Sequence, residues 1–137
     1  MLKRLDHVGI VVDDLTDAKR LLSETLGLTL VREQEVPELS RRVAFFQCGD
    51  ARIEVIEDLD AKAKVRVLDG ATARIEHVAV EVDDVSSVLA ALEGLGVRAD
   101  SHGILRVGAR VNAWTDPSTT DGIVFQLLSD APKNDPH

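Results

Sequence analysis

Residues 74–85 read RIEHVAVEVDDV and closely repeat residues 4–15, which read RLDHVGIVVDDL. The interval between the copies is 70 positions, as from His7 to His77. Repetition of this kind predicts that the chain is built from two copies of one supersecondary unit. In each copy the histidine lies in an apolar run rich in Val and Ile, which predicts a buried strand. The Asp-Asp pair that follows predicts the N-cap of a helix.

Each copy continues with the pattern of one helix and three strands. Apolar residues recur at helical spacing after each Asp-Asp pair, and glycines end both patterns, Gly27 in the first copy and Gly94 or Gly96 in the second. The strands expected next are residues 28–32, 43–47 and 52–56 in the first copy, and residues 97–100, 110–115 and 123–128 in the second. The chain is therefore predicted to have an α+β fold of two tandem βαβββ modules, about residues 4–58 and 74–129, within a single domain of residues 1–137.

Three other segments are expected to lack strands. Residues 33–40 form a polar segment broken by Pro37, and residues 58–70 connect the modules as a short helix or an extended linker. The tail from Ala131 to His137 contains two prolines and is expected to be frayed.

Length and composition are those of an ordinary soluble globular protein. The chain has 137 residues, of which 45% are hydrophobic and 29% are charged. Its formal charge of −8 argues against nucleic acid or anionic membranes as partners, because no basic stripe offsets phosphate charge. No apolar run approaches the roughly 20 residues of a membrane span, and the N-terminus leads into a strand rather than a signal peptide. We therefore expect a cytoplasmic protein.

Polar residues stand at matching places in the last strand of each module. Glu54 lies in the segment IEVI at residues 53–56, and Gln126 lies in the segment FQLL at residues 125–128. A buried polar group without a partner costs several kcal/mol, so each of these side chains needs a partner. A metal ion shared with the two histidines would provide one. The predicted ligand set is His7, Glu54, His77 and Gln126.

Two nitrogen and two oxygen ligands suit a borderline divalent ion, which the sequence leaves open among zinc, cobalt, nickel, manganese and iron. The single cysteine, Cys48, excludes a cysteine-based zinc cluster and an intrachain disulfide. Gly9 and Ala79 follow their histidines by two positions, on the same strand face, and would leave room beside the ion. The alternative is structural, with core histidines and with Glu54 paired to Arg52 or Arg110 as a solvated strand charge.

These motifs resemble those of the vicinal oxygen chelate superfamily, which includes glyoxalases, bleomycin resistance proteins and dioxygenases. About residues 4–129 fit, and within the superfamily the chain is most similar to methylmalonyl-CoA epimerases. The segments that carry this likeness are LDHVGI at residues 5–10, EVPE at 35–38, VAFF at 43–46, IEVIE at 53–57 and VDD at 82–84. The resemblance implies a cupped mixed sheet around a divalent metal, and a homodimer.

The resemblance also implies a reaction. In epimerases of this type the metal binds the thioester and carboxylate oxygens of an acyl-CoA and acidifies the proton on the carbon between them. Two protonatable groups then act on opposite faces of that carbon. One of them is usually a glutamate on the last strand, where this chain has Gln126, and an amide does not serve as the usual base. By the symmetry of the modules, Glu54 becomes ligand and candidate base, with Glu38 or Glu35 as the second acid or base.

Two other functions fit the same resemblance. A glyoxalase I-like lactoylglutathione lyase shares the metal positions but less of the surrounding sequence. A non-catalytic small-molecule-binding protein of the superfamily typically lacks a complete metal set and uses an aromatic pocket, whereas this chain has 3% aromatic residues. The sequence therefore favours a metal-dependent epimerase or isomerase whose exact substrate it does not identify.

Overall fold

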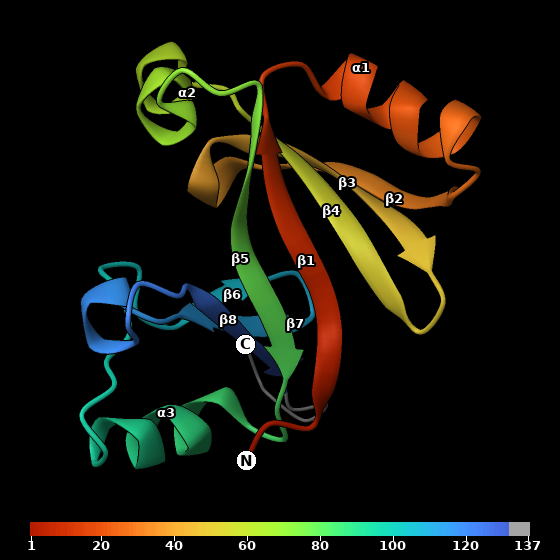
Figure 1. Ribbon diagram of the computed structural model, residues 1–137. Coiled ribbons are helices and arrows are strands. Elements are labelled where there is room, and N and C mark those ends of the chain that lie inside the picture. Colours follow the sequence, from red (N-terminus) through yellow and green to blue (C-terminus); the bar gives the residue numbers. More distant parts are fainter. Residues whose placement is uncertain (132–137) are drawn as a thin grey trace. The chain divides into compact units, whose positions relative to one another are not determined.

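The computed structural model describes residues 1–131 (Figure 1). The chain forms two compact units, one of residues 7–76 and one that combines residues 1–6 with the chain from His77 onward. It therefore crosses between the units at the peptide bonds that precede His7 and His77. Each unit holds one βαβββ module, which confirms the predicted α+β class. The tail that was expected to fray lies outside the described residues from position 132.

The first unit contains a sheet with the strand order β2-β3-β4-β1, in which β1 runs parallel to β4 and the other pairs are antiparallel. Its helix α1 (Leu15–Arg20) continues into a π-helical turn at Leu21–Thr25. Its strands are β1 (Arg4–Val12), β2 (Thr29–Val36), β3 (Arg41–Cys48) and β4 (Ala51–Asp58), and a 3-10 turn, Pro37–Leu39, separates β2 from β3. The first three residues of β1 belong to the other unit.

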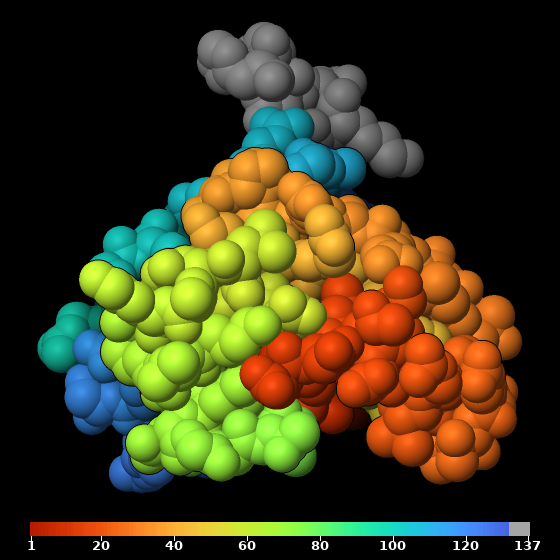
Figure 2. Space-filling view, turned by 90° about the horizontal axis from the view of Figure 1, so that it is seen from above, coloured from red at the N-terminus to blue at the C-terminus, as the bar shows by residue number. Residues whose placement is uncertain are grey.

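A helix, α2 (Ala61–Leu68), occupies the connection that was expected to be helical or extended. Lys64 fixes it to the first unit, since its Nζ atom lies 3.0 Å from the carbonyl oxygen of Asp13 and 3.0 Å from a carboxylate oxygen of Glu57. Figure 2 shows the yellow-green surface of this segment beside the red end of β1. Among the described residues, no helix is long and apolar enough to cross a membrane.

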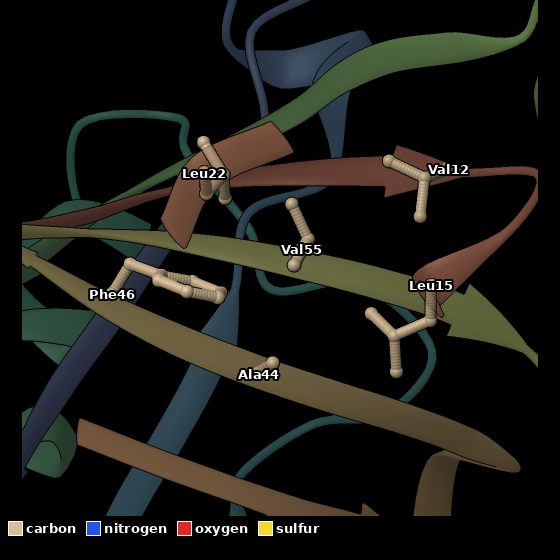
Figure 3. Close-up of a cluster of buried hydrophobic side chains, with 6 residues drawn as sticks. All are labelled: Val12, Leu15, Leu22, Ala44, Phe46 and Val55. Carbon is tan, nitrogen blue, oxygen red and sulfur yellow. The ribbon is translucent and has the colours of Figure 1, made fainter. Parts of the chain in front are cut away.

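Helix α1 covers one face of the sheet in the first unit. Asp14 caps the helix by accepting a hydrogen bond from the backbone N–H of Asp17, and Gly27 ends the segment with a φ of 75°. The side chains packed between helix and sheet are Val12, Leu15, Leu22, Ala44, Phe46 and Val55 (Figure 3). Because strand side chains alternate, the opposite face of the same strands carries His7, Gly9, Phe45 and Glu54.

The second unit repeats this arrangement, with the strand order β5-β8-β7-β6 and with β5 parallel to β8. Asp84 caps α3 by accepting a hydrogen bond from the backbone N–H of Ser87. The helix packs on β7 and β8 through a core that includes Val80, Leu89 and Leu127. The elements are β5 (Ala73–Glu81), α3 (Val85–Glu93), β6 (Leu105–Val107), β7 (Arg110–Trp114), a 3-10 turn at Pro117–Thr119 and β8 (Phe125–Asp130).

Two strand predictions were wrong. Residues 97–100 form no strand, and Ala99 makes a single bridge to Thr115, while the additional strand β6 lies at Leu105–Val107. Residues 33–36 belong to β2 rather than to a polar loop, because they pair with residues 41–44 of β3. The charged side chains of this stretch are accommodated by ion pairs, Lys19 with Glu33 at 2.8 Å and Arg42 with Glu35 at 2.6 Å.

Candidate functional site

The first unit brings His7 and Glu54 together on the face of the sheet away from α1. Gly9 lies opposite Glu54 in the parallel pair of β1 and β4, and His7 precedes Gly9 by two residues on the same face. Atom Nε2 of His7 is 3.2 Å from Oε1 of Glu54, and the two residues are only 3% and 8% exposed. A carboxylate buried to this degree is stabilised by a cation or a hydrogen-bond donor.

Phe45 shapes the surroundings of this pair. Its ring lies edge-on to the His7 ring, with a centroid distance of 5.2 Å and an interplanar angle of 88°. The guanidinium carbons of Arg32 and Arg52 lie 4.5 and 4.9 Å from the Phe45 ring centroid. Two cations therefore lie against the aromatic ring that contacts His7, an arrangement that favours anionic groups nearby.

The second unit places His77 and Gln126 in the same relation. Ala79 lies opposite Gln126 in the parallel pair of β5 and β8, and His77 precedes Ala79 by two residues. Both His77 and Gln126 are buried. The side chain of Gln126 donates from Nε2 to Oδ1 of Asn112 at 2.9 Å. The register confirms the sequence prediction that Glu54 and Gln126 occupy equivalent positions, each opposite a small residue that follows a histidine.

The two glutamates expected to act as the second acid or base lie in different settings. Glu35 is on β2 opposite Arg42, on the face shared with Ala44 and α1, so it lies on the other side of the sheet from Glu54. The expectation that Glu35 stands on a loop was wrong, since residues 33–36 are paired strand. Glu38 lies on the exposed Pro37–Leu39 turn and makes no hydrogen bond or ion pair within the described residues.

Arg41 forms a partly buried ion cluster on the His7–Glu54 face of the first unit. It donates two hydrogen bonds to the carboxylate of Glu76, at 2.8 and 2.6 Å, and one to Asp58 at 2.9 Å. Burial alone would lower the pKa of the Arg41 guanidinium, but its hydrogen bonds to Glu76 and Asp58 and their charges raise that pKa above its usual value. The cluster holds the segment of β5 that directly precedes His77.

Two polar residues of the second unit lie outside the predicted ligand set. Asn112 is buried and bonded to Gln126, and a single polar residue in an apolar strand was the only sequence signal for it. His102 is exposed, with its Nδ1 3.1 Å from Oδ2 of Asp100. Its ring lies 5.7 Å from that of Trp114, the residue opposite Gln126 in the β7–β8 pair.

Residues 6–112 match the sequence profile of the Glyoxalase/Bleomycin resistance protein/Dioxygenase superfamily. The chain belongs to this superfamily. The protein YqjC of Bacillus subtilis (strain 168), described as uncharacterized, is 33% identical over 99% of this chain and 97% of its own length.

Two further relatives have named activities. The crystal structure of methylmalonyl-CoA epimerase from Mycobacterium tuberculosis is similar with a TM-score of 0.87 and 29% identity, covering 96% of this chain and 91% of that one. A lactoylglutathione lyase of Arabidopsis thaliana is 27% identical over 98% of this chain, which spans 47% of the lyase. The superfamily member described here thus has enzymes of two reaction types among its relatives.

Proposed function

We propose that the protein is a metal-dependent epimerase that moves a proton at the carbon next to a thioester carbonyl, with methylmalonyl-CoA as the first substrate to test. The observation that carries this proposal is the equivalence of two buried pairs, His7 with Glu54 and His77 with Gln126, at the same strand register. The similarity to the M. tuberculosis epimerase along nearly the whole of both chains supports the substrate class.

The proposed ligand set of the metal is His7, Glu54, His77 and Gln126. Two imidazole nitrogens, a carboxylate oxygen and an amide oxygen fit zinc, cobalt, nickel, manganese or iron in its divalent state. A divalent ion held there would supply Lewis-acid stabilisation of the negative charge that develops on the substrate oxygens.

The residues of the chain divide the proton transfer between them. Glu54 takes the proton from the carbon between the two carbonyl groups, and the electron pair of the broken C–H bond moves toward the thioester oxygen. Glu38, on its exposed turn, returns a proton to the opposite face and so inverts the carbon. Gln126 holds its position as a ligand only, because its amide cannot accept this proton. Arg32 and Arg52 favour the anionic acyl-CoA.

Solvent exchange tests the proposed reaction. The protein is loaded with cobalt and incubated with methylmalonyl-CoA in D2O, and deuterium at the carbon between the carbonyl groups is followed by mass spectrometry. We expect incorporation of one deuterium per molecule together with conversion of a single epimer of the substrate into a mixture of the two epimers. No exchange by the metal-loaded protein across short malonyl-type thioesters would refute the epimerase proposal.

The relative from A. thaliana favours one second candidate, a lactoylglutathione lyase. Such an enzyme would convert the hemithioacetal of a thiol and an α-ketoaldehyde into a thioester. The cobalt-loaded protein can be assayed with that substrate beside methylmalonyl-CoA. Turnover of the hemithioacetal alone would replace the first proposal, and binding of either compound without turnover would indicate a non-catalytic member of the superfamily.

We also propose that the protein is a cytoplasmic homodimer, which its family resemblance and composition support.

A further inference from the structure

We infer that Asn112 is a positioning residue, which turns the side chain of Gln126 so that its carbonyl oxygen is the atom offered to a ligand. The role of the Gln126 oxygen as a metal ligand rests on the proposed metal site. The orientation of the Gln126 side chain follows from contacts within the second unit alone. It also accounts for the presence of an amide at position 126, where the sequence resembles a family that usually has a carboxylate.

The orientation follows from a chain of three groups. The backbone carbonyl of Leu105 can only accept, so the side-chain atom of Asn112 that lies 3.3 Å from it must be the donor Nδ2. Atom Oδ1 of Asn112 is then the acceptor that faces Gln126. Its partner at 2.9 Å must be the donor Nε2 of Gln126. The carbonyl oxygen of Gln126 is therefore turned away from Asn112.

Burial of this series of hydrogen bonds fixes the orientation of the Gln126 amide. Asn112 and Gln126 are only 5% and 8% exposed, so water competes little for their hydrogen bonds. A rotated Gln126 amide would set two oxygen atoms against each other. Asn112 lies on β7, on one side of β8, and Ala79 and His77 lie on β5, on its other side. The Gln126 oxygen is thus held away from β7, which leaves it available as a ligand.

The same contact selects the residue type at position 126. Asn112 presents an acceptor there, which suits the N–H group of glutamine. A glutamate would bring a carboxylate oxygen against that acceptor, unless Asn112 rotated and lost its bond to Leu105. The acceptor that Asn112 presents therefore matches a glutamine at position 126 and not a glutamate. In this chain the carboxylate of the ligand set is instead supplied by Glu54.

A double-mutant cycle of Asn112→Ala with Gln126→Glu tests this role through cobalt affinity, measured by absorbance titration. In the wild-type background, Asn112→Ala should weaken cobalt binding about 10- to 100-fold, as is typical when a partner of a metal ligand is lost. In the Gln126→Glu background it should not weaken cobalt binding, because both terminal atoms of a carboxylate are oxygens and the acceptor that opposes one of them is removed. An equal loss in both backgrounds would show a structural effect and overturn the inference.

The control variant is Thr115→Val, which removes the buried hydroxyl of the residue that follows β7. Thr115 is bonded to the backbone of Ile123 and Phe125, not to Gln126. We expect it to leave cobalt affinity unchanged even if it lowers the melting temperature. A loss of affinity equal to that of Asn112→Ala would count against a specific role for Asn112.

A measurement without metal separates this inference from the proposed function. In the 15N spectrum of the metal-free protein, the side-chain NH2 signals of Gln126 should be protected from solvent exchange, and Asn112→Ala should abolish that protection. Unprotected signals in the wild type would overturn the inference whatever the cobalt result. Protected signals in a protein that binds no cobalt would support the orientation and refute the metal site.

Discussion

Glu54 is the residue whose two proposed roles can be separated by one substitution. Its carboxylate lies 3.2 Å from Nε2 of His7 in a buried setting, and it is proposed both to bind metal and to accept the substrate proton. Glu54→Gln keeps an oxygen ligand but removes the base. We expect cobalt binding to persist, while the rate of deuterium incorporation falls by about 10²- to 10⁴-fold, the usual contribution of a general base.

The matched control is Glu35→Gln. Glu35 lies on the helix-covered face and pairs with Arg42, so its neutralisation should leave the exchange rate unchanged. If instead Glu35→Gln slowed exchange and Glu54→Gln did not, the assignment of the base would be wrong. The comparison is direct because both substitutions replace a carboxylate by an amide of the same shape.

At the scale of the elements, the partly buried cluster around Arg41 joins β3 to β4 and to the start of β5. Arg41→Met removes the cation beside the buried carboxylate of Asp58 and the partly buried carboxylate of Glu76. We expect the free energy of unfolding to fall by about 3–5 kcal/mol, as for other broken buried ion pairs. Chemical denaturation measures the change.

The next residue along β3 provides the control for this prediction. Arg42 makes an exposed ion pair with Glu35, so Arg42→Met should change the stability little. Equal effects of the two substitutions would mean that the Arg41 cluster contributes no more than a surface pair. Since Arg41 holds the strand segment before His77, a destabilised Arg41→Met protein should also bind cobalt less tightly.

The cap of α3 predicts how the stability of the fold depends on pH. Hydrogen bonds from the Ser87 side chain and backbone lower the pKa of Asp84. Because the folded-state pKa is the lower one, the charge of Asp84 stabilises the fold above the unfolded pKa, and this contribution is lost as the pH falls through the folded value. Asp84→Asn should therefore melt below the wild type at pH 7 and converge with it below about pH 4.

Melting temperatures measured from pH 7 to pH 3 test this effect, with Asp50→Asn in the β3–β4 turn as a control that should follow the wild type throughout. A constant difference between Asp84→Asn and the wild type across this range would show that the charge of Asp84 has no part in the cap. Asparagine is a fitting replacement because it is itself a good capping residue.

The sequence was sufficient where a pattern was repeated or periodic. The 70-residue repeat predicted β1, β5 and both capped helices, and the alignment of Glu54 with Gln126 agrees with the strand register. The segment before β7 has no such pattern, and β6 was misplaced because its three residues form a strand only by pairing with β7. Asn112 was missed because its role depends on a carbonyl seven residues away.

At the scale of the whole molecule, a metal that binds only the folded chain must stabilise it. Cobalt at about 100 times its dissociation constant should raise the free energy of unfolding by about 2.7 kcal/mol. Thermal unfolding with and without cobalt measures this gain. The gain should disappear in His7→Ala and in His77→Ala, because the proposed site uses both histidines. Stabilisation that survived in either variant would contradict a ligand role for that histidine.

The most direct test of the central claim is the metal content of the protein, determined by elemental analysis after loading with cobalt and removal of the excess. We predict about one ion per chain in the wild type and in His102→Ala, and none in His7→Ala or His77→Ala, because a four-ligand site needs both histidines. A wild-type protein without bound metal, or a His102→Ala protein that alone lost it, would contradict the proposed site.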